Sequence, residues 1–148
     1  METLLLNILN GLSQGMLLFM IAVGLTTVFG VLGILNFAHG SLFMLGAYLC
    51  LQSMQLFDSF WFGLLVGPLC VVVVGVLVEK FLLKNVYDRD VSYQLLLTFA
   101  LLLILDDAVR LIWGAGYHVV EAPAVLNGVL SIAGQPYPAY RIFLILVG

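Results

Sequence analysis

The segment Asn36-Phe37-Ala38-His39-Gly40-Ser41 places polar side chains and a glycine inside the longest uncharged part of this chain. Residues 3–57 contain no Asp, Glu, Lys or Arg. An apolar region of this length is typical of a chain that crosses a lipid bilayer, where polar groups and breaks in a helix are costly. The segment therefore marks either a special backbone conformation or a functional group of side chains.

The composition of the whole chain favours a membrane protein. It is 64% hydrophobic and 9% charged, with a mean hydropathy of +1.20, whereas soluble domains are about 45–50% apolar and about 25% charged. Too few charges are present to cover a soluble core. Because open strands cannot span lipid, the sequence predicts an all-α, polytopic helical integral membrane protein. The net charge of −3 argues against a nucleic-acid partner.

Four segments are long and apolar enough to be complete spans: residues 4–35, 37–56, 60–78 and 91–113. After Arg141 the sequence reads IFLILVG, which we interpret as the start of a fifth span; a tail lying in the membrane interface is the competing interpretation. We expect residues 1–148 to form a single transmembrane domain, the front part of a longer protein. The first residues lack a basic region and a cleavage site, so we expect them to be retained.

The charge distribution predicts the sidedness. The linker at residues 79–90 holds Lys80, Lys84 and Arg89, and basic residues near span ends mark the cytoplasmic side. Residues 114–140 then face outside. Four simple crossings place the N-terminus outside as well, and a broken first segment would change that count. Turn signals flank residues 129–133 in the outer loop, where a small hairpin and an irregular loop both fit.

The first apolar segment is too long for one crossing, because residues 3–35 would make a helix of about 50 Å against a hydrocarbon core of about 30 Å. In one arrangement residues 4–12 lie in the interface and residues 15–34 span. In the other, which we favour, residues 4–23 span and the glycine-interrupted residues 24–35 re-enter. A broken or re-entrant segment would then hold Asn36 to Gly40 at membrane depth, lining a cavity or buried in protein.

Five residues of the opening segment are candidates for a substrate path: Asn36, Phe37, His39, Gly40 and Ser41. Asn36 suits the N-cap of the second span, accepting a hydrogen bond from the N–H of His39 or its neighbour. The free N–H groups of a helix start suit an anionic solute group, and Gly40 allows close approach of a backbone or ligand. A cap, an interfacial His and packing glycines would also explain the segment without a ligand. A His39 that titrates with proton flow is a third interpretation.

The fourth apolar segment carries Asp106, Asp107 and Arg110. Charges within a span are costly and usually pair or face a cavity. Either carboxylate can reach the guanidinium at helical spacing, so we expect an intramembrane ion pair with a structural or outer-gate role.

No catalytic, metal or cofactor motif is present: the sequence has no HExxH, GxSxG or GxxxxGK[ST]. We expect no enzyme activity, no metal and no cofactor, and energy for any transport must come from a partner or an ion gradient. Cys50 and Cys70 lie in apolar runs and are expected to be free thiols. Gly63 and Gly67 form a GxxxG pattern, which is common in glycine-rich membrane chains.

Several stretches resemble one known family. GLTTVFGVLGILNFAHGSLFMLGAY at residues 24–48 resembles the signature of the permease subunits of branched-chain amino acid ABC importers. The resemblance continues through VEK at 78–80, LDDAVRLIWG at 105–114 and PYPAYR at 136–141.

The resemblance implies a multi-pass subunit in the bacterial inner (cytoplasmic) membrane. It implies a second homologous permease subunit, two cytoplasmic ATPase subunits and a periplasmic solute-binding protein as partners. Family permeases are longer, and their ATPase-coupling loop lies in the later half, so this chain corresponds to the N-terminal half of a permease. The implied function is ATP-driven import of branched-chain or related amino acids. Because the family also includes relatives that carry urea or short amides, the resemblance leaves the solute open. A passive channel or ion-coupled carrier for urea or another small polar solute is the alternative function, and a non-transporting assembly subunit is a third.

Overall fold

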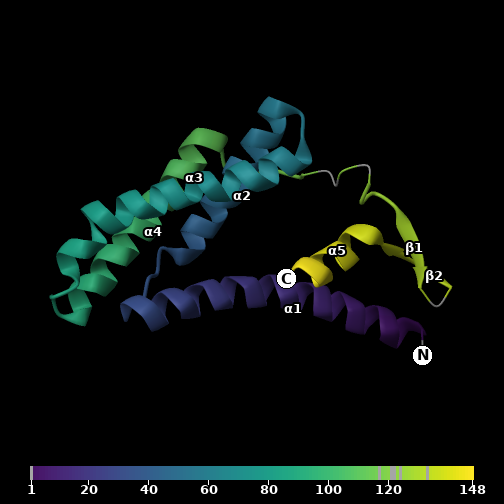
Figure 1. The fold of residues 1–148 in the computed structure, drawn as a ribbon, viewed down its shortest axis with the longest axis horizontal. Helices are drawn as coiled ribbons and strands as arrows, with labels where there is room; N and C mark the ends of the chain where they lie inside the picture. Colours follow the sequence, from purple (N-terminus) through teal and green to yellow (C-terminus); the bar gives the residue numbers. More distant parts are fainter. Residues whose placement is uncertain (1, 117, 121–122, 124, 133) are drawn as a thin grey trace. The chain divides into compact units, whose positions relative to one another are not determined.

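A computed structural model describes residues 2–116, 118–120, 123, 125–132 and 134–148. Contacts divide the chain into two units, residues 25–119 and residues 1–24 with 120–148, and the first helix contributes to both. The elements, shown in Figure 1, are α1 (Glu2–Leu32), α2 (His39–Phe57), α3 (Phe60–Phe81), the 3₁₀ turn η1 (Leu83–Val86), α4 (Val91–Trp113), β1 (Val129–Ile132), β2 (Gln135–Pro138) and α5 (Ala139–Val147).

Three helices in the described part of the chain are long and apolar enough to cross a membrane. They cover Leu4–Val31, His39–Phe57 and Phe60–Val86, so the prediction of a helical, polytopic fold is supported. A helix also forms over the expected residues 91–113, and another begins at Ala139. We still predict, without a test, that the first of these helices is a fourth span and that the second begins a fifth.

The helix α1 runs without interruption from Glu2 to Leu32, a length of about 46 Å. The expected break at Gly24 is therefore wrong. Which residues of α1 span the membrane and which lie in the interface stays a prediction. The physical reason is that a glycine costs little in a span, where no water competes for the backbone hydrogen bonds. The break comes at Gly33, whose φ of +67° favours glycine. A break near Asn36 is thus confirmed, and its depth in the membrane stays a prediction.

Two residues connect α2 to α3. Asp58 has a left-handed backbone with φ +47°, a conformation that Asp tolerates better than most residues. The Ser59 hydroxyl caps α3 by accepting a hydrogen bond from the N–H of Phe62 at 3.4 Å. The ring centroids of Phe57 and Phe62 lie 4.4 Å apart across the turn. This connection turns the chain back so that α2 and α3 run antiparallel.

Small residues bring α2 and α3 close together. A Cβ added at Gly67 would lie 2.8 Å from Cys50 Cβ, and one at Gly63 would lie 2.3 Å from Met54 Cγ. A Cβ at Gly46 would lie 3.2 Å from Val71 Cγ2. Each step of four residues along α2 is matched by four residues along α3, which is a regular antiparallel small-residue interface. The GxxxG pattern of Gly63 and Gly67 is therefore a true packing surface.

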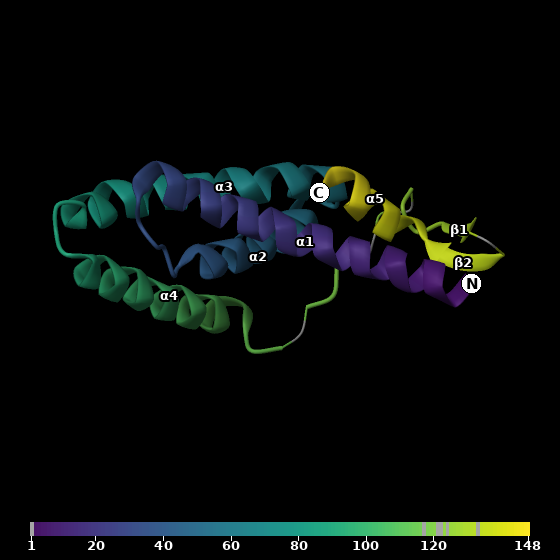
Figure 2. The ribbon, with the colours of Figure 1, turned by 90° about the horizontal axis from the view of Figure 1, so that it is seen from below.

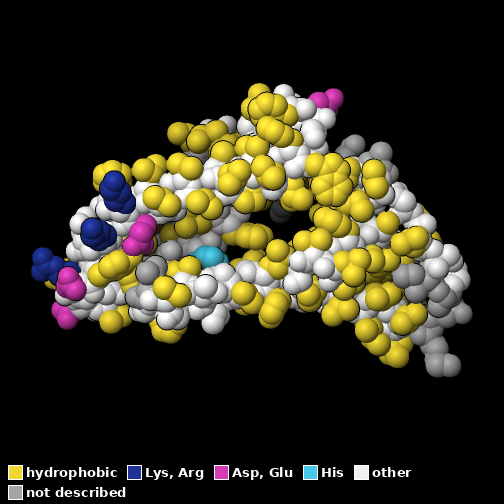
Figure 3. Space-filling view, viewed as in Figure 1, with side chains coloured by type: hydrophobic (Ala, Val, Ile, Leu, Met, Phe, Trp, Pro, Cys, Tyr) yellow, Lys and Arg dark blue, Asp and Glu magenta, His cyan; other side chains and the backbone are white. Residues whose placement is uncertain are grey.

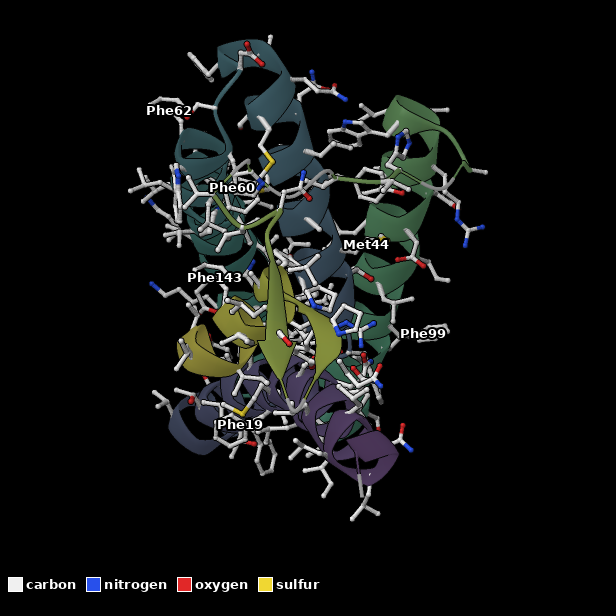
Figure 4. The ribbon with its side chains drawn as sticks, turned by 90° about the vertical axis from the view of Figure 1, so that its right-hand side faces the viewer. Phe19, Met44, Phe60, Phe62, Phe99 and Phe143 are labelled. Atoms are coloured by element: carbon white, nitrogen blue, oxygen red, sulfur yellow. The ribbon has the colours of Figure 1, made fainter. Side chains whose placement is uncertain are left out.

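The helix α2 lies between α3 and α4 (Figure 2). The connection from α3 to α4 is held by Gln94, whose Nε2 lies 3.3 Å from the carbonyl oxygens of Val86, Tyr87 and Arg89. Figure 3 shows that basic and acidic side chains gather over this connection, while apolar side chains cover most of the remaining surface in view. Phe99 points outward from α4 (Figure 4) and is 50% exposed, as a lipid-facing side chain would be.

The second unit contains the predicted hairpin, and its position outside the membrane stays a prediction. Strands β1 and β2 pair antiparallel, with Leu130 opposite Tyr137, so the hairpin is the correct one of the two alternatives. Ala133, the last residue of the expected segment between the two turn signals, lies outside the described residues. The N–H of Ala139 donates to Gly128 O at 2.9 Å, which joins the start of α5 to the hairpin. Arg141 on α5 donates a hydrogen bond to Asn10 on α1.

We predict that Gly67→Ala destabilises the chain by about 1–3 kcal/mol, because the added methyl group overlaps the backbone and Cβ of Cys50. Thermal unfolding of the detergent-solubilised chain, followed by circular dichroism, measures this. Gly75→Ala on the same helix is the matched control, since a Cβ there meets nothing within 4 Å. If both variants unfolded together with the parent, α2 and α3 would not pack through this face.

Candidate functional site

The non-helical residues between α1 and α2 alternate between buried and exposed. Ile34, Asn36 and Ala38 are 2%, 8% and 1% exposed, whereas Leu35 and Phe37 are both 44% exposed. This period of two is the pattern of an extended chain with one face packed. The segment therefore presents one row of side chains to the protein and the other row away from it.

The side chain of Asn36 organises the turn into α2. Its Oδ1 accepts a hydrogen bond from the N–H of Ala38 at 3.0 Å, and its carbonyl oxygen accepts from the N–H of His39 at 3.2 Å. The expected bond from a neighbour of His39 is thus present, but the expected N-cap position is wrong: the cap is Ala38, because residues 36–39 form a turn before α2 begins. Asn satisfies a backbone donor here that no helical carbonyl can reach.

Thr98 on α4 contacts the start of the non-helical residues between α1 and α2, and its side chain is fully buried. Its Oγ1 lies 3.0 Å from Gln94 O, 3.2 Å from Leu95 O and 3.4 Å from Leu35 O. A hydroxyl carries one proton, so it donates mainly within its own helix and reaches the Leu35 carbonyl as a longer, secondary contact. Thr98 thereby offers a donor to backbone that has left the helix.

Ser41 is the second point of contact with α4. Its hydroxyl donates to Asp106 Oδ1 at 2.9 Å and lies 3.5 Å from Leu102 O. Ser41 is 5% exposed, and Asp106 is half-buried. Among Asp106, Asp107 and Arg110, all three in the described part of the chain, the structure records no ion pair, and the last two are exposed. The structure therefore brings Asp106 to Ser41 and not to the expected partner Arg110.

The remaining candidate residues form what we call the open face, which consists of Phe37, His39 and Gly40. Phe37 and Gly40 are exposed and His39 is half-buried. A Cβ added at Gly40 would meet nothing within 4 Å, so the close approach expected there does not come from the described part of this chain. The five candidates thus divide into two groups: Asn36 and Ser41 are buried, whereas the open face consists of two exposed residues and the half-buried His39.

A polar and aromatic contact farther along α2 and α4 is absent from the sequence-based predictions. The indole N–H of Trp113 donates to Gln52 Oε1 at 3.1 Å. The ring centroid of Tyr48 lies 5.4 Å from the ring centroid of Trp113 and 5.5 Å from that of His118. His118 Nε2 lies 3.0 Å from the carbonyl oxygen of Trp113. Spacing on α2 was the available signal, since Ser41, Tyr48 and Gln52 recur on one helical face.

We predict that Asn36→Ala costs about 1 kcal/mol of stability, because the N–H of Ala38 loses its acceptor in a buried turn. Asn36→Ser keeps a side-chain oxygen and should recover most of that loss. The exposed neighbour Phe37→Ala is the control, with an expected change of about 0.5 kcal/mol or less. Thermal unfolding in detergent compares the three; equal stability of the Ala and Ser variants would show that the turn does not depend on this acceptor.

The chain is similar to a family of transport proteins. The family model described as "Branched-chain amino acid transport system / permease component" matches residues 7–147. Over 128 residues the chain is 27% identical to "High-affinity branched-chain amino acid transport system permease protein LivH" from Escherichia coli (strain K12), covering 80% of this chain and 41% of the relative. The protein of the same name from Salmonella typhimurium gives the same identity and coverage.

A second, shorter match has a higher sequence identity. The chain is 40% identical over 50 residues to "High-affinity branched-chain amino acid transport system permease protein BraD" from Pseudomonas aeruginosa, covering 34% of this chain and 16% of the relative. No solved structure matches the chain. The chain spans about two-fifths of the length of the LivH proteins. Since the family model extends from the first turns of α1 to the last residue of α5, the chain belongs to the family of branched-chain amino acid transport system permease components.

Proposed function

We propose that this chain is part of a transmembrane permease subunit of an ATP-driven importer for branched-chain or related amino acids. The observation that carries the proposal is the family match over residues 7–147. Three helices of membrane-spanning length and composition support it. The bacterial inner membrane is the expected location, with the basic connection between α3 and α4 on the cytoplasmic side.

The proposal includes partners. A second homologous permease subunit would complete the translocation path, two cytoplasmic ATPase subunits would supply energy, and a periplasmic solute-binding protein would deliver the solute. Two observations support this. The relatives are each named as the permease protein of a transport system, and the sequence has no phosphate-binding loop of its own. Broad exposed apolar surfaces on α1, α3 and α4 suit lipid and neighbouring helices.

Within this subunit, the open face of Phe37, His39 and Gly40 would border the solute route. An unwound segment inside an apolar chain is tolerated where it lines a cavity or is buried in protein. The first turn of α2 also presents the N–H groups of Gly40 and Ser41, which a helix leaves without intrahelical acceptors. Such a helix start suits the carboxylate of an amino acid. Asn36 and Ser41 would hold the segment in place from the inner side.

The function is tested with Gly40→Leu in the full-length permease, reconstituted in proteoliposomes with its ATPase and second permease subunits. Because nothing in the described chain lies within 4 Å of a Cβ at Gly40, the variant should fold and reach normal membrane levels. Uptake should fall by about tenfold or more, equivalent to about 1.4 kcal/mol of lost interaction. Gly75→Leu on α3, another open glycine, should keep parental uptake.

Two results would contradict the proposal. Uptake that persists at the parental rate after the ATPase subunits are omitted would favour a passive channel or an ion-coupled carrier. Parental uptake by Gly40→Leu would remove the open face from the solute route, even if the permease function holds.

A further inference from the structure

One of the three charged side chains on α4 is set apart from the other two. Asp106 is half-buried and its carboxylate accepts a hydrogen bond from the Ser41 hydroxyl at 2.9 Å. Asp107 and Arg110 are exposed. A polar side chain in apolar surroundings is unfavourable unless its oxygen accepts a hydrogen bond, and 2.9 Å lies within the normal range for an O–H···O bond. The donor that meets Asp106 comes from α2, 65 residues earlier in the chain.

Contacts with α4 hold the break at both of its ends. Thr98 reaches the carbonyl of Leu35 before the turn, and Asp106 reaches Ser41 after it. These two α4 residues lie about 12 Å apart on one face of the helix. Between the two contacts, Asn36 and Ala38 pack inward. The position of the open face therefore depends on how the two ends are held.

The two contacts differ in strength. Thr98 Oγ1 is closer to the carbonyl oxygens of its own helix than to Leu35 O, so it holds the first end weakly. At the other end, the 2.9 Å bond from Ser41 to Asp106 is the shorter of the two that Ser41 makes. Asp106 is thus the stronger point at which α4 fixes the start of α2.

We propose that Asp106 is a positioning residue for the solute route: through Ser41 it fixes the first turn of α2 on α4 and so orients the open face. This inference rests on the proposed permease function. It assigns Asp106 the role of hydrogen-bond acceptor, so that its oxygen is needed rather than its charge. Asp107 and Arg110 take no part in it.

The acceptor role makes a sharp prediction about substitutions. Asp106→Asn keeps a carbonyl oxygen that can accept from Ser41, and Ser41→Thr keeps the hydroxyl donor. Asp106→Ala and Ser41→Ala each remove one partner. Because both changes break the same bond, the double variant should resemble either single variant rather than add their effects. Asp107→Ala is the matched control, one position along the same helix and exposed.

The experiment measures the orientation of the open face directly. Phe37→Cys is introduced into the full-length permease in membranes, with the other cysteines replaced, and its rate of reaction with a small water-soluble thiol reagent is followed. We expect Asp106→Ala and Ser41→Ala each to change that rate by about threefold or more, the scale of coupling between contacting residues. Asp106→Asn, Ser41→Thr and Asp107→Ala should retain the parental rate.

Several outcomes would overturn the inference. These are a parental rate in Ser41→Ala, an Asp106→Asn variant that behaves like Asp106→Ala, or additive effects in the double variant. Ser41→Ala removes only one hydroxyl, so it keeps the test decisive if Asp106→Ala fails to reach the membrane. The labelling rate does not depend on transport: if the permease with Phe37 intact took up no solute with its partners while the Phe37→Cys series labelled as expected, the proposed function would be contradicted and this inference would stand.

Uptake measurements then separate positioning from solute binding. If Asp106 acts only through Ser41, Asp106→Asn restores the uptake lost in Asp106→Ala, and the KM for the solute follows the labelling rate across the series. If the carboxylate itself binds the solute, Asp106→Asn loses uptake while the labelling rate at Phe37→Cys stays parental, which would refute the positioning role.

Discussion

The constraint on which this structure depends is that backbone leaving a helix in an apolar chain must find its hydrogen bonds within the protein. Three features of the chain contribute to this between Leu32 and His39. Gly33 supplies a left-handed backbone that ends α1, Asn36 satisfies the N–H of Ala38 with its own side chain, and Thr98 offers a hydroxyl to the carbonyl of Leu35. Specific residues therefore stabilise the conformation of the chain between α1 and α2.

The helix α2 uses different chemistry on its two sides. Toward α3 it packs by close approach, with Cys50 and Met54 against glycines, and such a surface gains from van der Waals contact without needing water to be released. Toward α4 it uses hydrogen bonds, from Ser41 to Asp106 and from Trp113 to Gln52. Hydrogen bonds are directional, so this second side fixes the rotation of α2 and with it the direction in which the open face points.

The sequence predicted the helices well because their length and apolar character are local properties. The ranges expected for α2, α3 and α4 agree with the structure within a few residues at each end. The break near Asn36 was predicted, but its expected start at Gly24 was wrong, since the glycines at 24 and 30 suggested a weakness that a helix in lipid tolerates. Only Gly33, next to the polar Asn36 turn, adopts the left-handed conformation in this segment.

The partners of buried polar groups could not be predicted in the same way. Spacing along α4 favoured Arg110 as the partner of Asp106, because neighbours at helical spacing are all that a single sequence shows. The observed donor, Ser41, is remote in sequence and becomes available only once α2 packs beside α4. The contact between Gln52 and Trp113 is equally remote. The candidate residues were selected from the sequence as one group, and their role in a solute path stays a prediction, whereas the division between buried and exposed side chains required the structure.

The short connection at Asp58 and Ser59 has a consequence for biogenesis. Two residues are too few to let α2 and α3 partition into lipid separately, so the insertion machinery would receive them as one antiparallel pair. The strongly apolar α3 would then carry with it the more polar α2, whose Ser41, Gln52 and Ser53 disfavour entry on their own. Lengthening this connection would allow α2 and α3 to insert separately. The helix α2 would then tend to remain at the membrane surface.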